Sequence, residues 1–198
     1  MHISIEGFDG VGKTTVSTLV AAELDWVFVD KPLKHIFDPD GGITEYLRIR
    51  DYFNEISPRN KALSACFYGL GNMFLYEKFK DCNIVTDRHI LSNYAWSGGT
   101  ESMRIFEAIH SVIGSPTLTV ILYADNDTIT KRLRTRDTQD LDLKKLKHSE
   151  EIYSKMKFFA EKYKMPYIII DTNTLSPNDV VSLIMAELKK RNIIDEHA

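Results

Sequence analysis

This sequence of 198 residues has few cysteines, no excess of basic over acidic residues and no long apolar run. The two cysteines, Cys66 and Cys82, fit neither a metal-ligand spacing nor a disulfide framework, which favours reduced thiols in a cytoplasmic protein. The formal net charge of −3 predicts no overall attraction to nucleic acid or membrane. The longest apolar run, Leu118 to Ala124, is too short to span a bilayer, and the start MHISIEG lacks the features of a signal peptide. Any anion site must therefore be local.

Apolar runs alternate with helical patterns along the whole chain. The runs that read as buried strands cover residues 2–6, 26–29, 83–86, 117–124 and 167–170. Helical patterns cover residues 13–24, 44–55, 58–79, 103–113, 127–136, 150–163 and a last segment opened by Ser176-Pro177. The third of these helices is expected to start at Pro58, with Ser57 as its cap. This alternation predicts a single α/β domain, 1–198, with a five-stranded parallel sheet between helices. Ligands of such sheets bind where the strands end.

The stretch SIEGFDGVGKTT follows the first strand and contains the pattern Gly7-x4-Gly12-Lys13-Thr14. Glycines at such a turn let backbone N–H groups face phosphate oxygens, and the following helix adds its positive end. We expect Lys13 to reach the terminal phosphates, Thr14 to hold Mg²⁺ and Thr15 to donate to a phosphate. Gly10 completes the loop. A nucleoside triphosphate is predicted, but a GTPase switch, an ATPase motor and a small-molecule kinase all stay open.

Asp9 is a carboxylate inside this loop, where it would repel a bound triphosphate. Such a residue needs a compensating task, for example holding the acceptor through water or anchoring a loop that closes. Asp9 as an exposed turn residue is the simpler alternative.

The stretch NIVTDRHILSNYAW places Asp87 and Arg88 at the end of a buried strand that should lie beside the first. Asp87 can hold Mg²⁺ through water, and Arg88 can clamp an acceptor phosphate. An ordinary surface pair is the alternative. His89 is left out of the catalytic set, because a histidine in a loop more often serves as a hydrogen-bonding scaffold.

The run KRLRTR ends the helical pattern that stops at residue 136. Arg132 and Arg136 share one face of such a helix, whereas Arg134 points elsewhere. If this segment closes over the nucleotide, one or two of its arginines can neutralise the phosphoryl group in transfer. A solvated helix end is the alternative. The basic stretch from Leu143 to His148 is the candidate flexible segment, so the predicted lid covers residues 132–148.

With these stretches together, the chain resembles thymidylate kinases, within the P-loop nucleoside monophosphate kinases. The likeness rests on IEGFDGVGKTT and DRHILSNYAW, supported by DKPL, GGITEYLR and KRLRTR. The resemblance implies a three-layer P-loop kinase fold and transfer of the ATP γ-phosphate to a nucleoside monophosphate, with Mg²⁺. It also implies that the protein can form a homodimer, with the long helix after Pro58 as a candidate interface.

The resemblance assigns roles to several residues. Asp9 would steer the acceptor, Arg88 would hold its phosphate, and Phe67 would stack on its base, unless Phe67 is ordinary helix core. Asn93 and Ser97 lie where the family contacts the base edge.

Three positions depart from the family pattern. Gly71 stands where the family has an arginine that bonds to the base, and Ser97 stands where it has the glutamine of A-Y-Q. Asp30-Lys31 replaces the Arg-Glu pair that precedes the proline of the family's turn. Lys31 keeps a charge that can reach an acceptor phosphate, without a bidentate fork. The phosphate chemistry is therefore expected to be intact, while recognition of the base is altered.

Three functions remain open after this reading. The first is a nucleoside monophosphate kinase, with dTMP as the favoured acceptor. The second is a deoxynucleoside kinase, which needs a carboxylate base near the 5′-hydroxyl, with Glu6, Asp9 and Asp30 available. The third is a nucleotide-binding regulatory protein without turnover, against which Lys13, Thr14 and Arg88 weigh.

Overall fold

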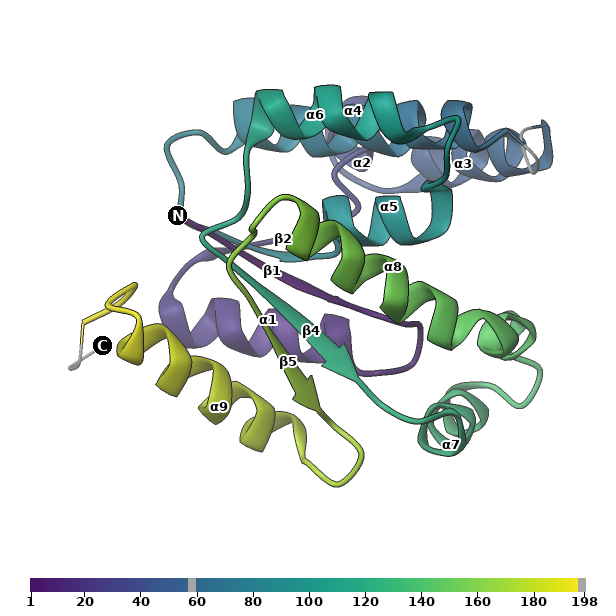
Figure 1. Ribbon diagram of the computed structural model, residues 1–198. Helices are drawn as coiled ribbons and strands as arrows, with labels where there is room; N and C mark the ends of the chain where they lie inside the picture. Colours follow the sequence, from purple (N-terminus) through teal and green to yellow (C-terminus); the bar gives the residue numbers. More distant parts are fainter. Residues whose placement is uncertain (57–59, 196–198) are drawn as a thin grey trace.

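The computed structural model describes residues 1–56 and 60–195 and confirms the predicted α/β architecture (Figure 1). Five parallel strands form one sheet in the order β2-β3-β1-β4-β5. The strands are β1 (His2–Gly7), β2 (Val27–Asp30), β3 (Ile84–Asp87), β4 (Leu118–Tyr123) and β5 (Tyr167–Asp171). Because β1 pairs with both β3 and β4, the loops that follow these three strands meet at one edge of the sheet.

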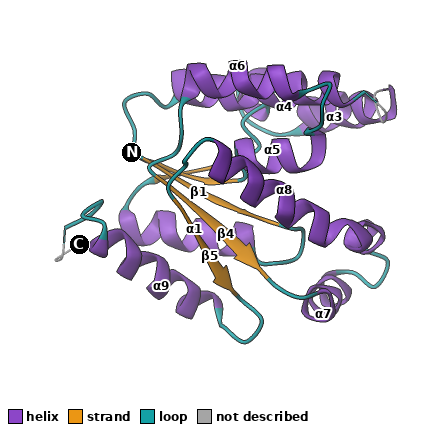
Figure 2. Ribbon diagram, in the orientation of Figure 1, coloured by secondary structure: helices purple, strands orange, loops and turns teal. Residues whose placement is uncertain are grey.

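Helices cover both faces of the sheet (Figure 2). The larger helices are α1 (Lys13–Leu24), α3 (Thr44–Ile56), α4 (Lys61–Lys78), α5 (Ile90–Ser97), α6 (Met103–Ile113), α7 (Asn126–Arg136), α8 (Ser149–Lys162) and α9 (Pro177–Lys190). The shorter ones are α2 (Lys34–Phe37) and the 3-10 helix η1 (Leu141–His148). Helices α1 and α9 pack together on one face, and α5 and α8 on the other. Helices α4 and α6 lie outside α5, so this side carries a second helical layer.

The core lies between the sheet and these helices, and strand β1 is buried along its whole length. Ile5 and Val120 of the sheet belong to the same buried cluster as Phe106 and Phe159 of the helices. Burial of each such side chain stabilises the fold by about 1.5–3 kcal/mol. Strand β1 alternates polar and apolar residues, yet both of its faces are buried, because helices cover both faces of the sheet. Its polar side chains are paired inside the protein: His2 bonds to the Thr86 hydroxyl at 2.9 Å, and the Ser4 hydroxyl donates to Glu6 at 3.2 Å.

Helices α2 and α5 and the 3-10 helix η1 lie where the sequence pattern predicts no helix, and η1 covers the stretch from Leu143 to His148 that the sequence predicts to be flexible. Helix α5 is buried on nearly every side, so it lacks the polar face that creates a helical period. Helix α2 is a single turn. The predicted start of the third helix at Ser57-Pro58 lies outside the described residues; α4 begins at Lys61, where the Asn60 side chain accepts a hydrogen bond from the N–H of Leu63 at 2.8 Å.

Two expectations about composition can also be compared with the structure. No helix in residues 1–56 and 60–195 is long and apolar enough to cross a membrane. Cys66 and Cys82 are both free thiols with exposed side chains, as expected.

Candidate active site

The glycine-rich loop between β1 and α1 is held in place by its two apolar residues. Phe8 and Val11 are buried in the main core, so the loop is anchored from below while its polar atoms face outward. Gly10 and Gly12 both have positive φ angles, 84° and 100°, that side-chain-bearing residues rarely adopt. Gly12 caps α1 without a side-chain hydrogen bond, so the first amides of the helix stay available to an anion.

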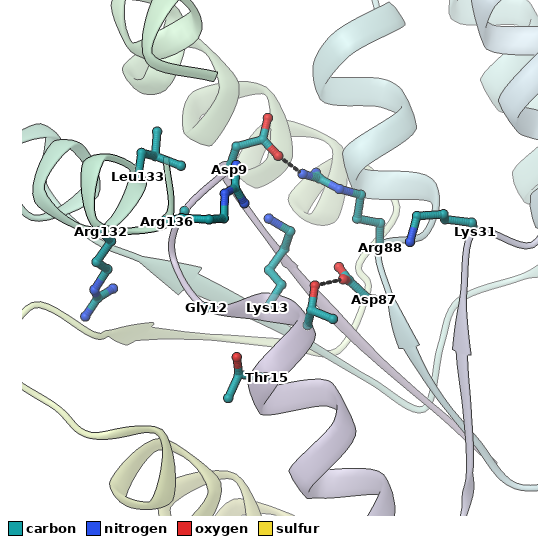
Figure 3. A pocket seen from close by; sticks show the side chains of 12 residues that line it. Asp9, Gly12, Lys13, Thr15, Lys31, Asp87, Arg88, Arg132, Leu133 and Arg136 are labelled. Atoms are coloured by element: carbon teal, nitrogen blue, oxygen red, sulfur yellow. Dashed lines mark hydrogen bonds and ion pairs between the residues drawn. The ribbon is translucent and has the colours of Figure 1, made fainter. Parts of the chain in front are cut away.

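A cavity of about 450 Å³ opens over this loop (Figure 3). Most of the predicted phosphate-site residues line it, together with Leu133: Asp9, Gly10, Gly12, Lys13, Thr14, Thr15, Lys31, Asp87, Arg88, Arg132 and Arg136. Gly7 does not line the cavity; it ends β1 so close to β4 that an added Cβ would lie 2.4 Å from the carbonyl oxygen of Leu122. The cavity thus combines the ends of β1, β2 and β3 with one face of α7.

Lys13 is buried at the floor of the cavity, and its Nζ donates to the carbonyl oxygen of Phe8 at 2.6 Å. Burial, and then the charge of Arg88, lower the pKa of this ammonium to about 8. Asp9 and Asp87 oppose that shift. A phosphate chain in the cavity would supply the negative charge that favours the protonated amine.

Thr14 and Asp87 form a pair of oxygen donors suited to Mg²⁺. The Thr14 hydroxyl donates to Oδ2 of Asp87 at 2.5 Å. The other carboxylate oxygen, Oδ1, is buried without a hydrogen-bond partner among the described residues. A hard cation that is held by hydroxyl and carboxylate oxygens, phosphate and water fits this arrangement. No cluster of three or more acidic, histidine or cysteine side chains that would hold a metal by itself occurs in the described part of the chain.

Asp9 lies at the centre of a cationic group. Arg88 donates to one of its carboxylate oxygens, and Nζ of Lys145 lies 3.3 Å from the other. Burial alone would raise the pKa of Asp9, but the charges of Arg88, Lys13 and Lys145 outweigh it and lower the pKa to about 2. Asp9 is therefore a paired anion rather than an exposed turn residue.

Arg88 is positioned by Glu6, which the sequence suggests only as a possible catalytic base. Glu6 is completely buried, and its carboxylate accepts hydrogen bonds from the backbone N–H of His89 at 2.9 Å and from the hydroxyl and N–H of Ser92. These bonds fix the turn in which Arg88 adopts a left-handed backbone with φ 75°. Ser92 also accepts from the Arg88 guanidinium at 3.1 Å. In the sequence, the acidic residue near the end of the first strand, Glu6, and the serine of DRHILS, Ser92, are the features from which this support of Arg88 could have been found.

Arg132 and Arg136, the two arginines of α7 that line the cavity, differ in what they contact. Arg136 points into the cavity, whereas Arg132 points away from Lys13 (Figure 3). The Arg132 guanidinium donates to the carbonyl oxygen and hydroxyl of Thr172 at 2.6 and 3.0 Å. Between them, Leu133 is buried and packs on the phosphate loop, because a Cβ at Gly10 would lie 2.9 Å from its Cδ2 atom. The first residues of the predicted lid are therefore anchored on the loop.

Lys31 follows β2 at the edge of the same cavity. It too has a left-handed backbone, with φ 44°. Its ammonium pairs with Asp30, which also holds Lys34 at 2.5 Å. Two of the cavity's cations, Lys31 and Arg88, thus have a left-handed backbone, which is uncommon for residues other than glycine.

The predicted base-binding residues lie outside this cavity. Phe67 on α4 is stacked at 4.1 Å from Phe53 and nearly parallel to Phe37 at 6.2 Å, measured between ring centroids. Asn93 donates to the carbonyl oxygen of Ala65, and its own Oδ1 is buried without a partner in the described chain. Ser97, at the end of α5, is also buried.

Gly71 leaves room that another residue fills. A Cβ at Gly71 would lie 3.0 Å from the Cγ atom of Leu33, which is itself buried. The turn after β2 therefore packs directly on α4, one helical turn from Phe67.

Known proteins match this chain along most of its length. The family model of thymidylate kinase matches residues 5–184. A probable thymidylate kinase of Methanocaldococcus jannaschii is 26% identical over 194 residues, which cover 96% of each chain. Two solved structures, each 17% identical, share the fold: deoxyadenosine kinase from M. mycoides, with a TM-score of 0.69 over 96% of this chain and 100% of that one, and thymidylate kinase from Ehrlichia chaffeensis, with a TM-score of 0.64 over 96% and 98%.

Proposed function

The chain belongs to the thymidylate kinase family, and we propose that it transfers the γ-phosphate of ATP to a nucleoside monophosphate, with dTMP as the favoured acceptor. The observation that carries this proposal is the shared cavity. Lys13, the Thr14–Asp87 pair and Arg88 with its partner Asp9 all line it. A donor phosphate chain at Lys13 and an acceptor phosphate at Arg88 can therefore share one cavity.

The chain's own residues would act mainly by position and charge. The loop amides and Lys13 bind the donor phosphates, and Arg88 orients the acceptor phosphate in line with them. Arg136 adds charge from the lid side, where phosphoryl oxygens become more negative during transfer. Thr14 and Asp87 would hold Mg²⁺, which when bound neutralises phosphate charge. Lys31 lies where it can supply a further point charge to the acceptor.

The preference for dTMP rests on the relatives and on the surroundings of Phe67. Curated relatives are described as probable thymidylate kinases at 26–30% identity. Phe67 is stacked on Phe53 at 4.1 Å between ring centroids, so a base would add to this group of rings rather than stack on Phe67 alone. The unpaired Oδ1 of Asn93 can accept a hydrogen bond from a base N–H group. Leu33 against Gly71 makes this side apolar, so the base would be read by few hydrogen bonds.

The deoxynucleoside kinase alternative needs a carboxylate that is free to accept a proton. Glu6 is enclosed by hydrogen bonds, and Asp9 is held by Arg88 and Lys145. Asp30 is held by two lysines. None of these three acids offers a free carboxylate to a 5′-hydroxyl, so the monophosphate reading is preferred.

A coupled assay of ADP release would test the proposal. We expect ATP turnover only when a nucleoside monophosphate is added, with the highest kcat/KM for dTMP among the natural monophosphates and deoxynucleosides. Arg88→Ala should lower kcat/KM for the monophosphate while leaving the Kd for the ATP analogue within a few-fold. Turnover only with unphosphorylated nucleosides would establish the alternative, and no turnover despite ATP binding would indicate a regulatory protein.

We also propose a homodimer formed through α4. Its exposed side carries an apolar stripe at helical spacing, formed by Leu63, Cys66, Leu70 and Met73. A two-fold contact along this stripe would bring the stripes of two copies together. Light scattering should give twice the chain mass, and Leu70→Glu should give the monomer with the fold intact. A monomeric wild type at micromolar concentration would refute the dimer.

A further inference from the structure

A continuous series of ion pairs runs from the lid to the end of β3. Arg136 donates to Asp140 at 2.7 Å and to Asp142 at 2.9 Å. Asp142 also accepts from Lys145 at 2.6 Å. Lys145 in turn reaches Asp9, which holds Arg88. Acids and bases alternate along the whole series, and each of its cations has a carboxylate partner.

Lys145 is the member of this series that joins the lid to the phosphate loop. It comes from η1, 136 residues after Asp9 in the chain. Its Nζ also lies 5.5 Å from the centre of the Trp96 ring, on α5. Lys145 does not line the cavity, but the carboxylate that it contacts does. A lysine stem is flexible, so a small movement would bring this ammonium to a phosphate in the cavity.

The contacts of Lys145 are of a kind that phosphate can replace. Its side chain is 46% exposed, and its two ion pairs are screened accordingly. Phosphate oxygens carry more charge than a carboxylate and accept the same N–H donors. A triphosphate in the cavity therefore competes with Asp9 and Asp142 for one ammonium.

We propose that Lys145 is a phosphate-binding cation of the lid, stored on Asp9 and Asp142 in the free protein and transferred to the terminal phosphates of a bound nucleoside triphosphate. This proposal rests on the proposed function for its ligand. Its consequence is that Asp142 competes with the nucleotide, because it pairs with both Arg136 and Lys145, the two lid cations that would contact the phosphates. Asp9 is released from the lid when the nucleotide binds.

Two hypotheses for Lys145, transfer to the bound phosphates and a fixed contact between lid and loop, predict opposite effects of a substitution at Asp142. If Lys145 moves to the phosphates, Lys145→Met should weaken binding of a non-hydrolysable Mg–ATP analogue about tenfold, the loss of one charge-assisted hydrogen bond. Asp142→Asn should tighten it several-fold. If Lys145 only fastens the lid to the loop, both substitutions should act in the same direction. Lys147→Met, an exposed lysine on the same helix, is the matched control, and Lys145→Arg should retain the affinity.

Calorimetry with the analogue alone measures these affinities without an acceptor, so the result stands even if the monophosphate screen shows no turnover. Trp96 supplies a second readout: in the Trp26→Phe background, the analogue should change the Trp96 emission, and Lys145→Met should remove that change. Equal affinities for Lys145→Met and Lys147→Met, weaker binding by Asp142→Asn, or an emission change independent of Lys145 would each overturn the proposal. Thermal unfolding monitors that each variant is folded.

Discussion

Triphosphate affinity should fall as pH rises, because Lys13 loses its proton near pH 8 in the free protein. Burial and the charge of Arg88 lower the pKa of this amine to about 8. A phosphate chain beside Nζ favours the charged form and raises the pKa again. Above pH 8 the bound protein therefore holds a proton that the free protein has released, and linkage weakens binding.

The size of the effect follows from this pKa. Affinity is nearly constant below pH 7 and falls by about one decade for each pH unit above pH 8, so about tenfold, or about 1.4 kcal/mol, is lost between pH 7 and pH 9. Phosphate groups have a second pKa of about 6, so the ligand keeps its charge over this range.

Calorimetry of the Mg–ATP analogue at pH 7, 8 and 9 measures both the affinity and the proton uptake, when it is repeated in two buffers of different ionisation enthalpy. Lys13→Arg is the matched control, since a guanidinium stays charged throughout and its affinity should not depend on pH. A wild-type affinity that is constant from pH 7 to pH 9, without proton uptake, would refute this account of Lys13.

Three further predictions concern stability, each measured as the free energy of unfolding in urea. His2 and His89 are buried, and burial lowers the pKa of both side chains, that of His89 to about 3. Unfolding therefore takes up protons below about pH 6.5, and His89 should lower the free energy of unfolding by about 1.4 kcal/mol between neutral pH and pH 5.5. If His89→Met lost the same stability over this pH range as the wild type, this account would be wrong. Gly10→Ala should destabilise by about 1–3 kcal/mol more than Gly12→Ala, because the added methyl meets Leu133 only at Gly10, and equal costs would argue against this packing. Glu6→Gln should lower the free energy of unfolding by about 2–4 kcal/mol, because the amide NH₂ of glutamine would face the backbone N–H groups that now donate to the Glu6 carboxylate. An unchanged free energy of unfolding would exclude the role of Glu6 in fixing the turn that holds Arg88.

The phosphate loop could be predicted from sequence because its signals are local. Gly7, Gly12 and Lys13 fall within seven consecutive residues, directly between a strand and a helix that the sequence also predicts. The parallel order of the strands also follows from the alternation of strands and helices. Asp87 and Arg88 were placed beside the loop for the same reason, since adjacent strand ends meet at one edge of the sheet.

The rest of the site depends on contacts that sequence spacing does not encode. The contact between Lys145 and Asp9 needs η1 to fold back over the loop, and nothing in a basic stretch specifies that path. Arg132 and Arg136 share a helix face, as expected, but Thr172 at the end of β5 draws only Arg132 away. The relation of Phe67 to the cavity depends on how α4 packs, which is set by tertiary contacts rather than by propensity.

The structure answers the question that Asp9 raises in the sequence. Arg88 lies close enough to Lys13 that its charge lowers the pKa of the Lys13 ammonium. Without an anion between them, they would repel each other and Lys13 would lose its proton more readily. Asp9 supplies that anion from inside the loop, and its low pKa keeps it charged throughout the neutral range. On its own, the Asp9 carboxylate would repel a triphosphate, but here it holds together the cations that attract a triphosphate. Each of these cations becomes available to the nucleotide when phosphate oxygens replace the Asp9 carboxylate as its partner.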